Sequence, residues 1–200
     1  MNEIRINGEN KELVWDKEAA IKNIVDEITR GFVGTQQVIS EIQIDGQLVT
    51  EENEAALLAL PVEKIAMIEI LTSTPRDLAY ETLDTLERYI DRLCSSIERA
   101  GIHYAEKNLV AGDAYFLKSI DGLDLFIQTI GGVKAALRVG AEQTVMLAEA
   151  DLMSTMHDLV EAKQQNNYVF MSQLLQNEFI ENLNHWKTVV FPFLRMWKTS

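Results

Sequence analysis

The chain has 200 residues, 47% of them hydrophobic and 24% charged, a composition typical of a globular protein with a buried core. Its net charge is −13, and both the part before residue 74 and the part after it are acidic. Surfaces that bind nucleic acid or anionic lipid need clustered lysine and arginine, which this sequence lacks. It also shows no signal-peptide pattern and no apolar run of spanning length. We therefore expect a cytoplasmic protein with no nucleic-acid or membrane partner.

The first 73 residues carry signals for short strands and two helices. Residues 4–15 predict a hairpin that turns at Asn7-Gly8 and continues toward Leu13, Val14 and Trp15. The other predicted elements are a helix that Asp16 caps and that ends near Gly31, a hairpin over 38–49 that turns at Asp45-Gly46, a short helix over 50–60 and a strand over 65–73. In the strand 38–44, the alternation of apolar and polar residues is regular except at Ile39.

This order of hairpin, helix, hairpin, short helix and final strand resembles the β-grasp or ubiquitin-like roll. The resemblance implies that residues 1–73 form a small β-grasp domain. Ubiquitin-like proteins that are conjugated end in Gly-Gly directly after the last strand, whereas Ser73-Thr74-Pro75 follows the strand here. We therefore expect neither conjugation nor sulfur-carrier chemistry.

Residues 74–107 give the clearest helical signal. Thr74 is a suitable N-cap, Pro75 stands at the first helical position, and Asp77 lies where its carboxylate can bond back to the cap. Apolar residues then repeat at alternating spacings of four and three, which predicts one seam along the helix and a partner helix beside it. The seam residues are Ala79, Leu83, Leu86, Ile90, Leu93, Ile97, Ala100 and Tyr104.

Three more helices are predicted after it. The first covers 113–130, where Gly131-Gly132 should end or bend it, and the last should kink or stop at Pro192. The methionines of these helices are expected to fill the core: Met146, Met153, Met156 and Met171. Helices of this length with short connections favour an antiparallel bundle. The sequence thus predicts an α+β protein, with a β-grasp domain over 1–73 and an antiparallel four-helix bundle over 74–200.

The last predicted helix contains the stretch NNYVFMSQLLQNEFIENLNHW. This stretch contains an apolar pair, an acidic residue and a later tryptophan. In this it resembles a sequence pattern found in the last helix of small bacterial helical-bundle proteins of poorly defined function. The stretch also resembles, more distantly, the helical flagellar export chaperones. The matching residues are Leu174, Leu175, Glu178, Leu183 and Trp186. A proline that is common in the middle of this pattern is replaced by Asn182 here. The resemblance implies a helical bundle and carries over no functional residue.

The sequence shows no pattern for catalysis or metal binding. A di-iron site in a helical bundle needs Glu-x-x-His pairs, and none of the three histidines has Glu three positions earlier. Glycine-rich phosphate loops and nucleophile elbows are also missing from the sequence. Cys94 has no evident histidine partner and is expected to be a core or flanking residue. We therefore nominate no catalytic residue and no metal ligand, and we expect no cofactor.

The C-terminal run 191–197 is the most suggestive local feature. It either continues the last helix and packs against the rest of the protein, or it is an exposed docking segment or dimer contact. Under the second interpretation, the candidate partner-binding residues are Phe191, Phe193, Leu194, Met196 and Trp197.

Three hypotheses of function follow. The first is a non-catalytic interaction protein of bacterial type, acting as an adaptor, chaperone or assembly scaffold that binds a protein partner through apolar surface of the bundle or the C-terminus. The second is an enzyme or small-ligand binder with a pocket at the domain junction, where His103 or His185 would be the candidates. The third is a structural homodimer whose helices pair through their heptad seams.

Overall fold

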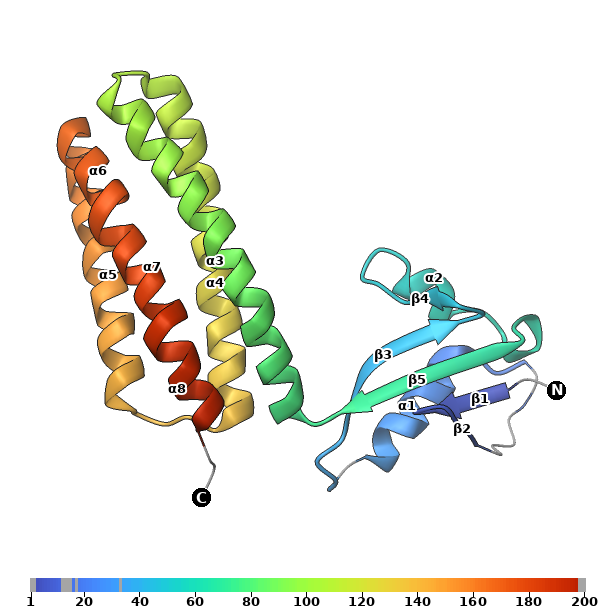
Figure 1. Cartoon of the computed structure of the whole chain (residues 1–200). Coiled ribbons are helices and arrows are strands. Elements are labelled where there is room, and N and C mark those ends of the chain that lie inside the picture. Colours follow the sequence, from blue (N-terminus) through green and yellow to red (C-terminus); the bar gives the residue numbers. More distant parts are fainter. Residues whose placement is uncertain (1–2, 12–15, 17, 33, 198–200) are drawn as a thin grey trace. The chain divides into compact units, whose positions relative to one another are not determined.

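The computed structural model describes residues 3–11, 16, 18–32 and 34–197. Its contacts divide the chain into two compact units, Met1–Leu78 and Ala79–Ser200, which we call the sheet unit and the helical unit. Each unit buries its own set of apolar side chains. The strands lie in the first unit and the long helices in the second (Figure 1). This confirms the predicted α+β class.

The sheet unit holds a five-stranded mixed sheet in the order β2-β1-β5-β3-β4. Its strands are β1 (Glu3–Ile6), β2 (Glu9–Asn10), β3 (Val38–Ile44), β4 (Gln47–Leu48) and β5 (Met67–Ser73). The central strand β5 runs parallel to β1, whereas the other pairs are antiparallel. The turn residues Asn7 and Asp45 have φ values of 51° and 50°, and a glycine follows each, as the two predicted hairpins require. The first predicted hairpin also includes residues 12–15, which lie outside the described residues.

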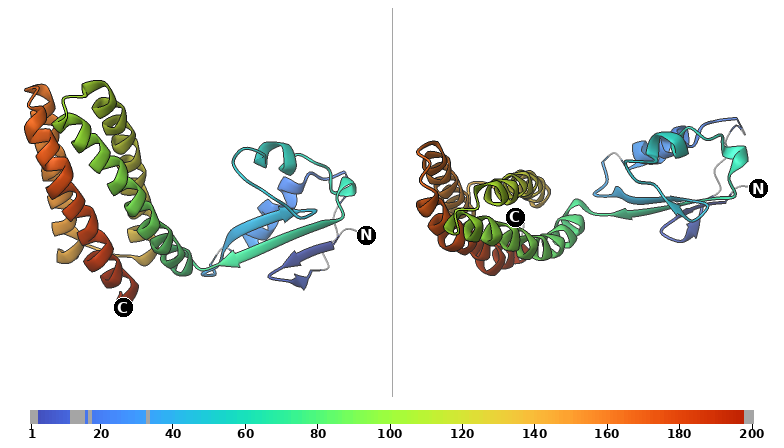
Figure 2. Two further views of the ribbon diagram at one scale, coloured as in Figure 1. Left: turned by 45° about the horizontal axis from the view of Figure 1, so that its top comes forward. Right: turned by 90° about the horizontal axis from the view of Figure 1, so that it is seen from above.

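One helix covers a face of this sheet (Figure 2). It is α1 (Ile21–Gly31), which buries Ile21, Ile24 and Ile28 in a core shared with Ile68 and Ile70 of β5. The short α2 (Glu54–Leu58) and the 3₁₀ turn η1 (Val62–Lys64) complete the unit.

The prediction that Asp16 caps the first long helix is wrong. The helix begins at Ile21, because the chain just before it is extended and Ala20 bridges Pro61. The carboxylate of Asp16 instead accepts a hydrogen bond from the backbone N–H of Glu18 at 3.2 Å.

A β-bulge explains the irregular alternation at Ile39. In the pairing of β3 with β5, Ile39 lies opposite Thr72 but Glu41 lies opposite Leu71, so Ser40 is the extra residue. The bulge turns Ile39 to the same face as Ile42, and both pack against the core of the sheet unit.

The helical unit consists of three long helices and a last segment that is helical from 168 to 196. The long helices are α3 (Pro75–Ala105), α4 (Leu109–Leu137) and α5 (Gln143–Gln164). The last segment is made of α6 (Tyr168–Leu174), α7 (Ile180–His185) and α8 (Phe191–Met196), joined by the π-helical turns η2 (Leu175–Phe179) and η3 (Trp186–Val190). None of the helices in the described ranges is long and apolar enough to cross a membrane.

The predicted start of α3 is confirmed. The backbone N–H of Asp77 donates to Thr74 Oγ1 at 3.0 Å, and the Thr74 hydroxyl donates to Asp77 Oδ2 at 2.7 Å. Pro75 is the first helical residue. All eight predicted seam residues are buried in the core of the helical unit. Local capping and the apolar period therefore specify this helix from the sequence alone.

The glycine pair does not end its helix, and Pro192 does not stop the last one. Gly131 and Gly132 lie inside α4, where Ile130 and Val133 on either side of them are buried in the core. The last helical segment also continues past Pro192 to Met196. The π-helical turn η3 lies just before this proline. Its wider hydrogen-bonding pattern accommodates the proline, which has no backbone N–H to donate.

The helical unit is built from two similar hairpins, α3–α4 and α5–α8. Two residues after the end of each first helix, the chain adopts the left-handed conformation, at Lys107 with φ 60° and at Asn166 with φ 54°. Each next helix is capped by an asparagine with nearly equal angles, φ −85° and ψ 74° at Asn108 and φ −85° and ψ 71° at Asn167. In both turns the asparagine side chain accepts the backbone N–H of the third residue after it.

The buried positions of the two hairpins correspond as well. The two asparagine caps are 59 residues apart, the buried pair Phe126 and Trp186 is 60 apart, and the buried pair Val133 and Leu194 is 61 apart. The offset grows by one residue across each of η2 and η3, because a π-helical turn holds one residue more than an α-helical turn. The last segment is thus a counterpart of α4 with two inserted residues.

Candidate functional site

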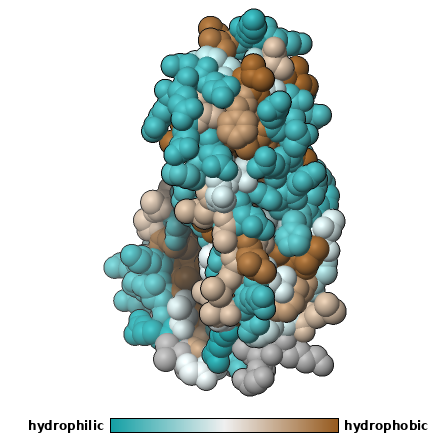
Figure 3. Space-filling model, turned by 90° about the vertical axis from the view of Figure 1, so that its left-hand side faces the viewer, coloured by the Kyte–Doolittle hydropathy of each residue, from teal (hydrophilic) through white to brown (hydrophobic). Residues whose placement is uncertain are grey.

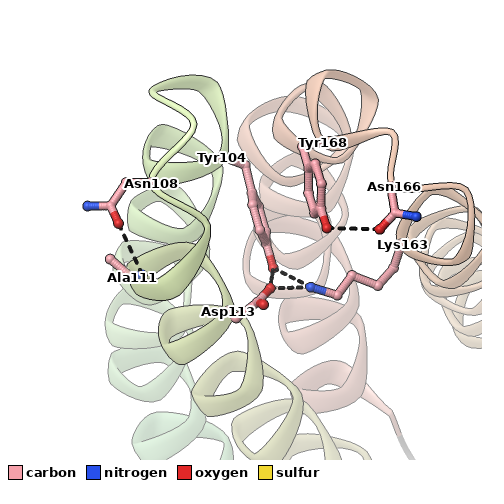
Figure 4. Close-up of polar contacts among 7 residues, drawn as sticks. All are labelled: Tyr104, Asn108, Ala111, Asp113, Lys163, Asn166 and Tyr168. Carbon is pink, nitrogen blue, oxygen red and sulfur yellow. Dashed lines mark hydrogen bonds and ion pairs between the residues drawn. The ribbon is translucent and has the colours of Figure 1, made fainter.

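A polar cluster lies at the end of the helical unit where the two hairpin turns are found (Figure 4). The hydroxyl of Tyr104 on α3 donates to Asp113 Oδ1 on α4 at 2.6 Å. The ammonium group of Lys163 on α5 forms an ion pair with the same Asp113 oxygen and lies 3.4 Å from the Tyr104 oxygen. The cluster therefore joins three helices through one carboxylate.

Aromatic rings surround the ammonium group of this cluster. Lys163 Nζ lies 5.3 Å from the ring centre of Tyr104, 5.5 Å from that of Tyr168 and 6.0 Å from that of Phe116. The rings of Tyr104 and Tyr168 stack at 5.5 Å, and the Tyr168 hydroxyl donates to Asn166 Oδ1 in the turn before α6. Contacts of a cation with ring faces are favourable where water is partly excluded.

These contacts shift two pKa values in opposite directions. The Lys163 ammonium group, and then the Tyr104 hydroxyl, hold the pKa of Asp113 below its usual value. Burial, followed by the hydrogen bond to Asp113, raises the pKa of Tyr104. Both shifts favour a neutral phenol beside a charged carboxylate, and the carboxylate is paired with Lys163 within the cluster. We assign it a structural role, linking the two hairpins.

The decrease in the free energy of unfolding at alkaline pH tests this assignment. Because the folded-state pKa of Tyr104 is raised, its contribution is present below the ordinary tyrosine pKa of about 10 and is lost as the pH rises above it. We expect Tyr104→Phe to cost about 1 kcal/mol at neutral pH and to flatten the alkaline decline. Urea unfolding followed by circular dichroism between about pH 7 and 11 measures both effects. Tyr115→Phe, which removes a surface hydroxyl that accepts from Arg99, is the control, and an unchanged decline in Tyr104→Phe would contradict the assignment.

The outer face of α5 carries an apolar row that the core does not use. Its residues follow alternating spacings of four and three, the spacing of a coiled-coil seam. They are Met146, Ala150, Met153, His157 and Val160, all exposed, and we call them the α5 stripe. The large apolar members Met146, Met153 and Val160 are 51%, 62% and 50% exposed. Figure 3 shows apolar side chains among hydrophilic ones on a face of the helical unit.

The expectation that the methionines fill the core is therefore wrong for two of the four. Met171 is fully buried and Met156 packs partly against the core, whereas Met146 and Met153 are exposed. The physical reason is that α5 already buries a full apolar face, and the two exposed methionines lie one position beyond its members Val145 and Leu152.

Carboxylates dominate the charge of α5. The helix carries Glu149, Asp151, Asp158 and Glu161 and a single lysine, Lys163, which is paired with Asp113. Glu149 pairs with Lys134 of α4 at 2.6 Å. Within the described part of the chain, Asp151 and Asp158 form no ion pair with lysine or arginine, and Glu161 Oε1 lies 3.4 Å from His157 Nε2. The α5 stripe is thus a largely apolar row, interrupted by His157, on an acidic helix.

The five candidate partner-binding residues of the C-terminal run differ in how deeply they are buried. Phe191 and Leu194 are completely buried in the core of the helical unit. Phe193 and Trp197 are partly buried and pack against that core and against each other, at 5.7 Å between ring centres. Only Met196 is largely exposed, at 74%. Most of the run therefore packs within its own unit, and its role in partner binding stays a prediction.

His103, His185 and Cys94 have different surroundings. His103 is half-buried, stacks on Tyr115 at 5.5 Å between ring centres and lies 3.7 Å from Glu106, whereas His185 is exposed. Burial raises the pKa of Cys94 to about 11, so this thiol stays protonated at neutral pH. Among the residues that the structure describes, no three His, Cys, Asp or Glu side chains meet at one point.

Comparison with known families divides the chain in two. Residues 81–189, more than half of the chain, match the family model described as a domain of unknown function, DUF8042. The chain therefore belongs to this family. Residues 3–74 match a second model, the TP0873 N-terminal domain. No curated protein and no solved structure matches the chain.

Proposed function

We propose that the protein is a non-catalytic interaction protein, an adaptor, chaperone or assembly scaffold, that binds a protein partner through apolar surface of its helical unit. The observation that supports this proposal is the α5 stripe. Side chains as large as Met153 stay more than half exposed there, at the spacing with which helices pack against helices. Rows of exposed apolar side chains often mark interaction sites.

The proposal includes the architecture that would present this surface. In it, residues 1–73 form a β-grasp roll, which the parallel pair β1 and β5 at the centre of a mixed sheet supports. Residues 74–200 form an antiparallel four-helix bundle, which the two similar hairpins support. The protein acts in a bacterial cytoplasm, where its acidic surface, with a net charge of −13, keeps it from nucleic acids and anionic lipids.

Affinity capture with matched variants tests the proposal. The tagged chain is compared with Met146→Ser/Met153→Ser, with Met196→Ser and with the control Val110→Ser, whose valine is 86% exposed at the start of α4. We expect a stoichiometric partner with the unaltered chain, Met196→Ser and Val110→Ser, and its loss with the double variant. Circular dichroism and solution mass check that each variant is folded and monomeric.

Other outcomes have distinct meanings. Loss of the partner with Met196→Ser alone would move the site to the C-terminal run. A stable dimer that the double variant abolishes would favour the structural homodimer. If the unaltered chain retains no stoichiometric partner from cells that express it, the interaction proposal is overturned.

A further inference from the structure

We infer that a hollow on the exposed side of α3, lined by Thr85, Arg88 and Arg92, binds a phosphoryl group, either inorganic phosphate or a phosphate monoester. This inference goes beyond the proposed function and does not depend on it, because the hollow involves no residue of the α5 stripe. It combines the shape of the hollow, the charge of the arginines that line it and the pairing of the carboxylates near them.

The hollow brings two guanidinium groups to one space. It has a volume of about 380 Å³, within the range of roughly 300–1,000 Å³ that is usual for small-molecule sites. Thr85, Arg88 and Arg92 are all exposed and follow spacings of three and four. Residues at these spacings are neighbours on the surface of a helix, so both arginines can reach one ligand.

The positive charge of the two arginines is not neutralised nearby. Among the described residues, neither Arg88 nor Arg92 forms an ion pair. The neighbouring carboxylates of α3 are paired with cations of the last segment instead, Asp84 and Glu87 with Arg195 and Asp91 with Lys187. Like charges one helical turn apart repel each other, and an anion between Arg88 and Arg92 would relieve this repulsion.

Tyr89 restricts the positions that Arg92 can take. The guanidinium carbon of Arg92 lies 5.9 Å from the centre of the Tyr89 ring, within the range of a cation–π contact. The Tyr89 hydroxyl donates to the backbone carbonyl of Gly122 on α4 at 2.9 Å, which holds the ring against the neighbouring helix. A guanidinium group over a ring face still presents the N–H donors at its edge. Part of the site is therefore ordered before a ligand binds.

The available donors favour a phosphoryl group over a carboxylate. The Thr85 hydroxyl already donates to the backbone carbonyl of Glu81 at 3.2 Å, so the two guanidinium groups supply the hydrogen bonds. Each guanidinium group can bind two oxygens at once. A phosphate monoester offers three oxygens and almost two negative charges, whereas a carboxylate offers two oxygens and one charge. A long polyanion such as nucleic acid would also meet the acidic surface around the site, since the net charge is −13.

Titration of the full-length, isotope-labelled protein with inorganic phosphate tests this inference. NMR signals of the backbone amides of residues 85–92 and of the arginine side chains are followed at constant ionic strength, near pH 8, where phosphate is mostly a dianion. We expect saturable shifts at the hollow, and at least tenfold weaker binding of acetate. A phosphoserine peptide with no other charge distinguishes two sources of the same group. Tighter binding of this peptide than of phosphate would indicate a phosphorylated protein and the reverse a small molecule, and both results support the site.

Matched variants separate a site from general attraction to cations, with the backbone amide signals as the measure of affinity. Arg88→Gln/Arg92→Gln should weaken phosphate binding tenfold or more. Lys107→Gln/Arg138→Gln makes the same change of net charge at two exposed cations elsewhere in the helical unit and should leave the affinity nearly unchanged. Arg88→Lys/Arg92→Lys keeps the charge but loses the paired donors, and it should weaken binding severalfold. Glu81→Gln removes an exposed carboxylate one turn before Thr85 and should strengthen binding.

Three results would overturn the inference. Equal affinities for phosphate and acetate would show that the hollow does not select a phosphoryl group. Equal weakening by the double Gln variant of the hollow and by the control Lys107→Gln/Arg138→Gln would show attraction without a site. Shifts that do not saturate up to about 50 mM phosphate would show that Arg88 and Arg92 do not act together on one ligand. Circular dichroism checks that every variant is folded, so that a loss of binding is not a loss of structure.

Discussion

Trp186→Ala is expected to lower the free energy of unfolding of the helical unit by about 4 kcal/mol, the loss typical of a large aromatic side chain removed from a core. Trp186 is 1% exposed. Its ring packs edge-to-face on Phe126 at 5.4 Å between centres, and it contacts Phe191 at 6.4 Å. Alanine would leave a cavity among side chains that the surrounding helices hold in place. Urea unfolding followed by helical circular dichroism measures the change.

A second substitution at this position separates packing from hydrogen bonding. The indole Nε1 of Trp186 is buried and has no hydrogen-bond partner among the described residues. A buried unpaired N–H costs on the order of 1–3 kcal/mol, which Trp186→Phe would remove while keeping much of the ring. We therefore expect Trp186→Phe to cost far less than Trp186→Ala. Equal losses for the two variants would contradict this account of the core.

Gly112→Ala and Gly131→Ala should change stability in opposite directions, although both glycines lie in α4. A Cβ at Gly112 would stand 2.8 Å from two carbons of the Tyr104 ring, which is buried and cannot move aside. Overpacking of this kind costs typically 1–3 kcal/mol, more than alanine gains in helix propensity. A Cβ at Gly131 would meet nothing within 4 Å, so Gly131→Ala should gain about 0.5–1 kcal/mol.

The midpoint of urea unfolding distinguishes the two glycine variants, since it should fall for Gly112→Ala and rise for Gly131→Ala. If Gly112→Ala were neutral or stabilising, the close contact of Tyr104 with α4 would be wrong. If Gly131→Ala were destabilising, that glycine would have a role other than the packing described here.

The sequence predicts those parts of the fold that local signals determine. The cap at Thr74 and the seam of α3 were predictable because both depend on residues within a few positions of each other. The helix does not end at the glycine pair, because burial of Ile130 and Val133 outweighs the low helix propensity of two glycines. The π-helical turn η2 did leave a signal. Four large buried residues, Met171, Leu175, Phe179 and Leu183, follow one another at three successive spacings of four, which drift around a regular α-helix.

The candidate site was harder to predict. Periodicity identifies the buried face of α5, but it does not show that Met146 and Met153 fall just outside this face. The sequence does contain a signal for the α5 stripe, a second series of spacings of four and three from Met146 to Val160. The cluster of Tyr104, Asp113 and Lys163 could not be predicted, because its members come from three helices whose pairing depends on tertiary structure.

The similarity of the hairpins α3–α4 and α5–α8 has a consequence for assembly. Each hairpin exposes an apolar face that a second hairpin must cover, as subunits do in a dimer. Here residues 138–142 tether the two hairpins in one chain, and a short tether gives an effective concentration in the millimolar range. Closure of the helical core is therefore intramolecular, and the stability of this unit should not depend on protein concentration as that of an obligate dimer does.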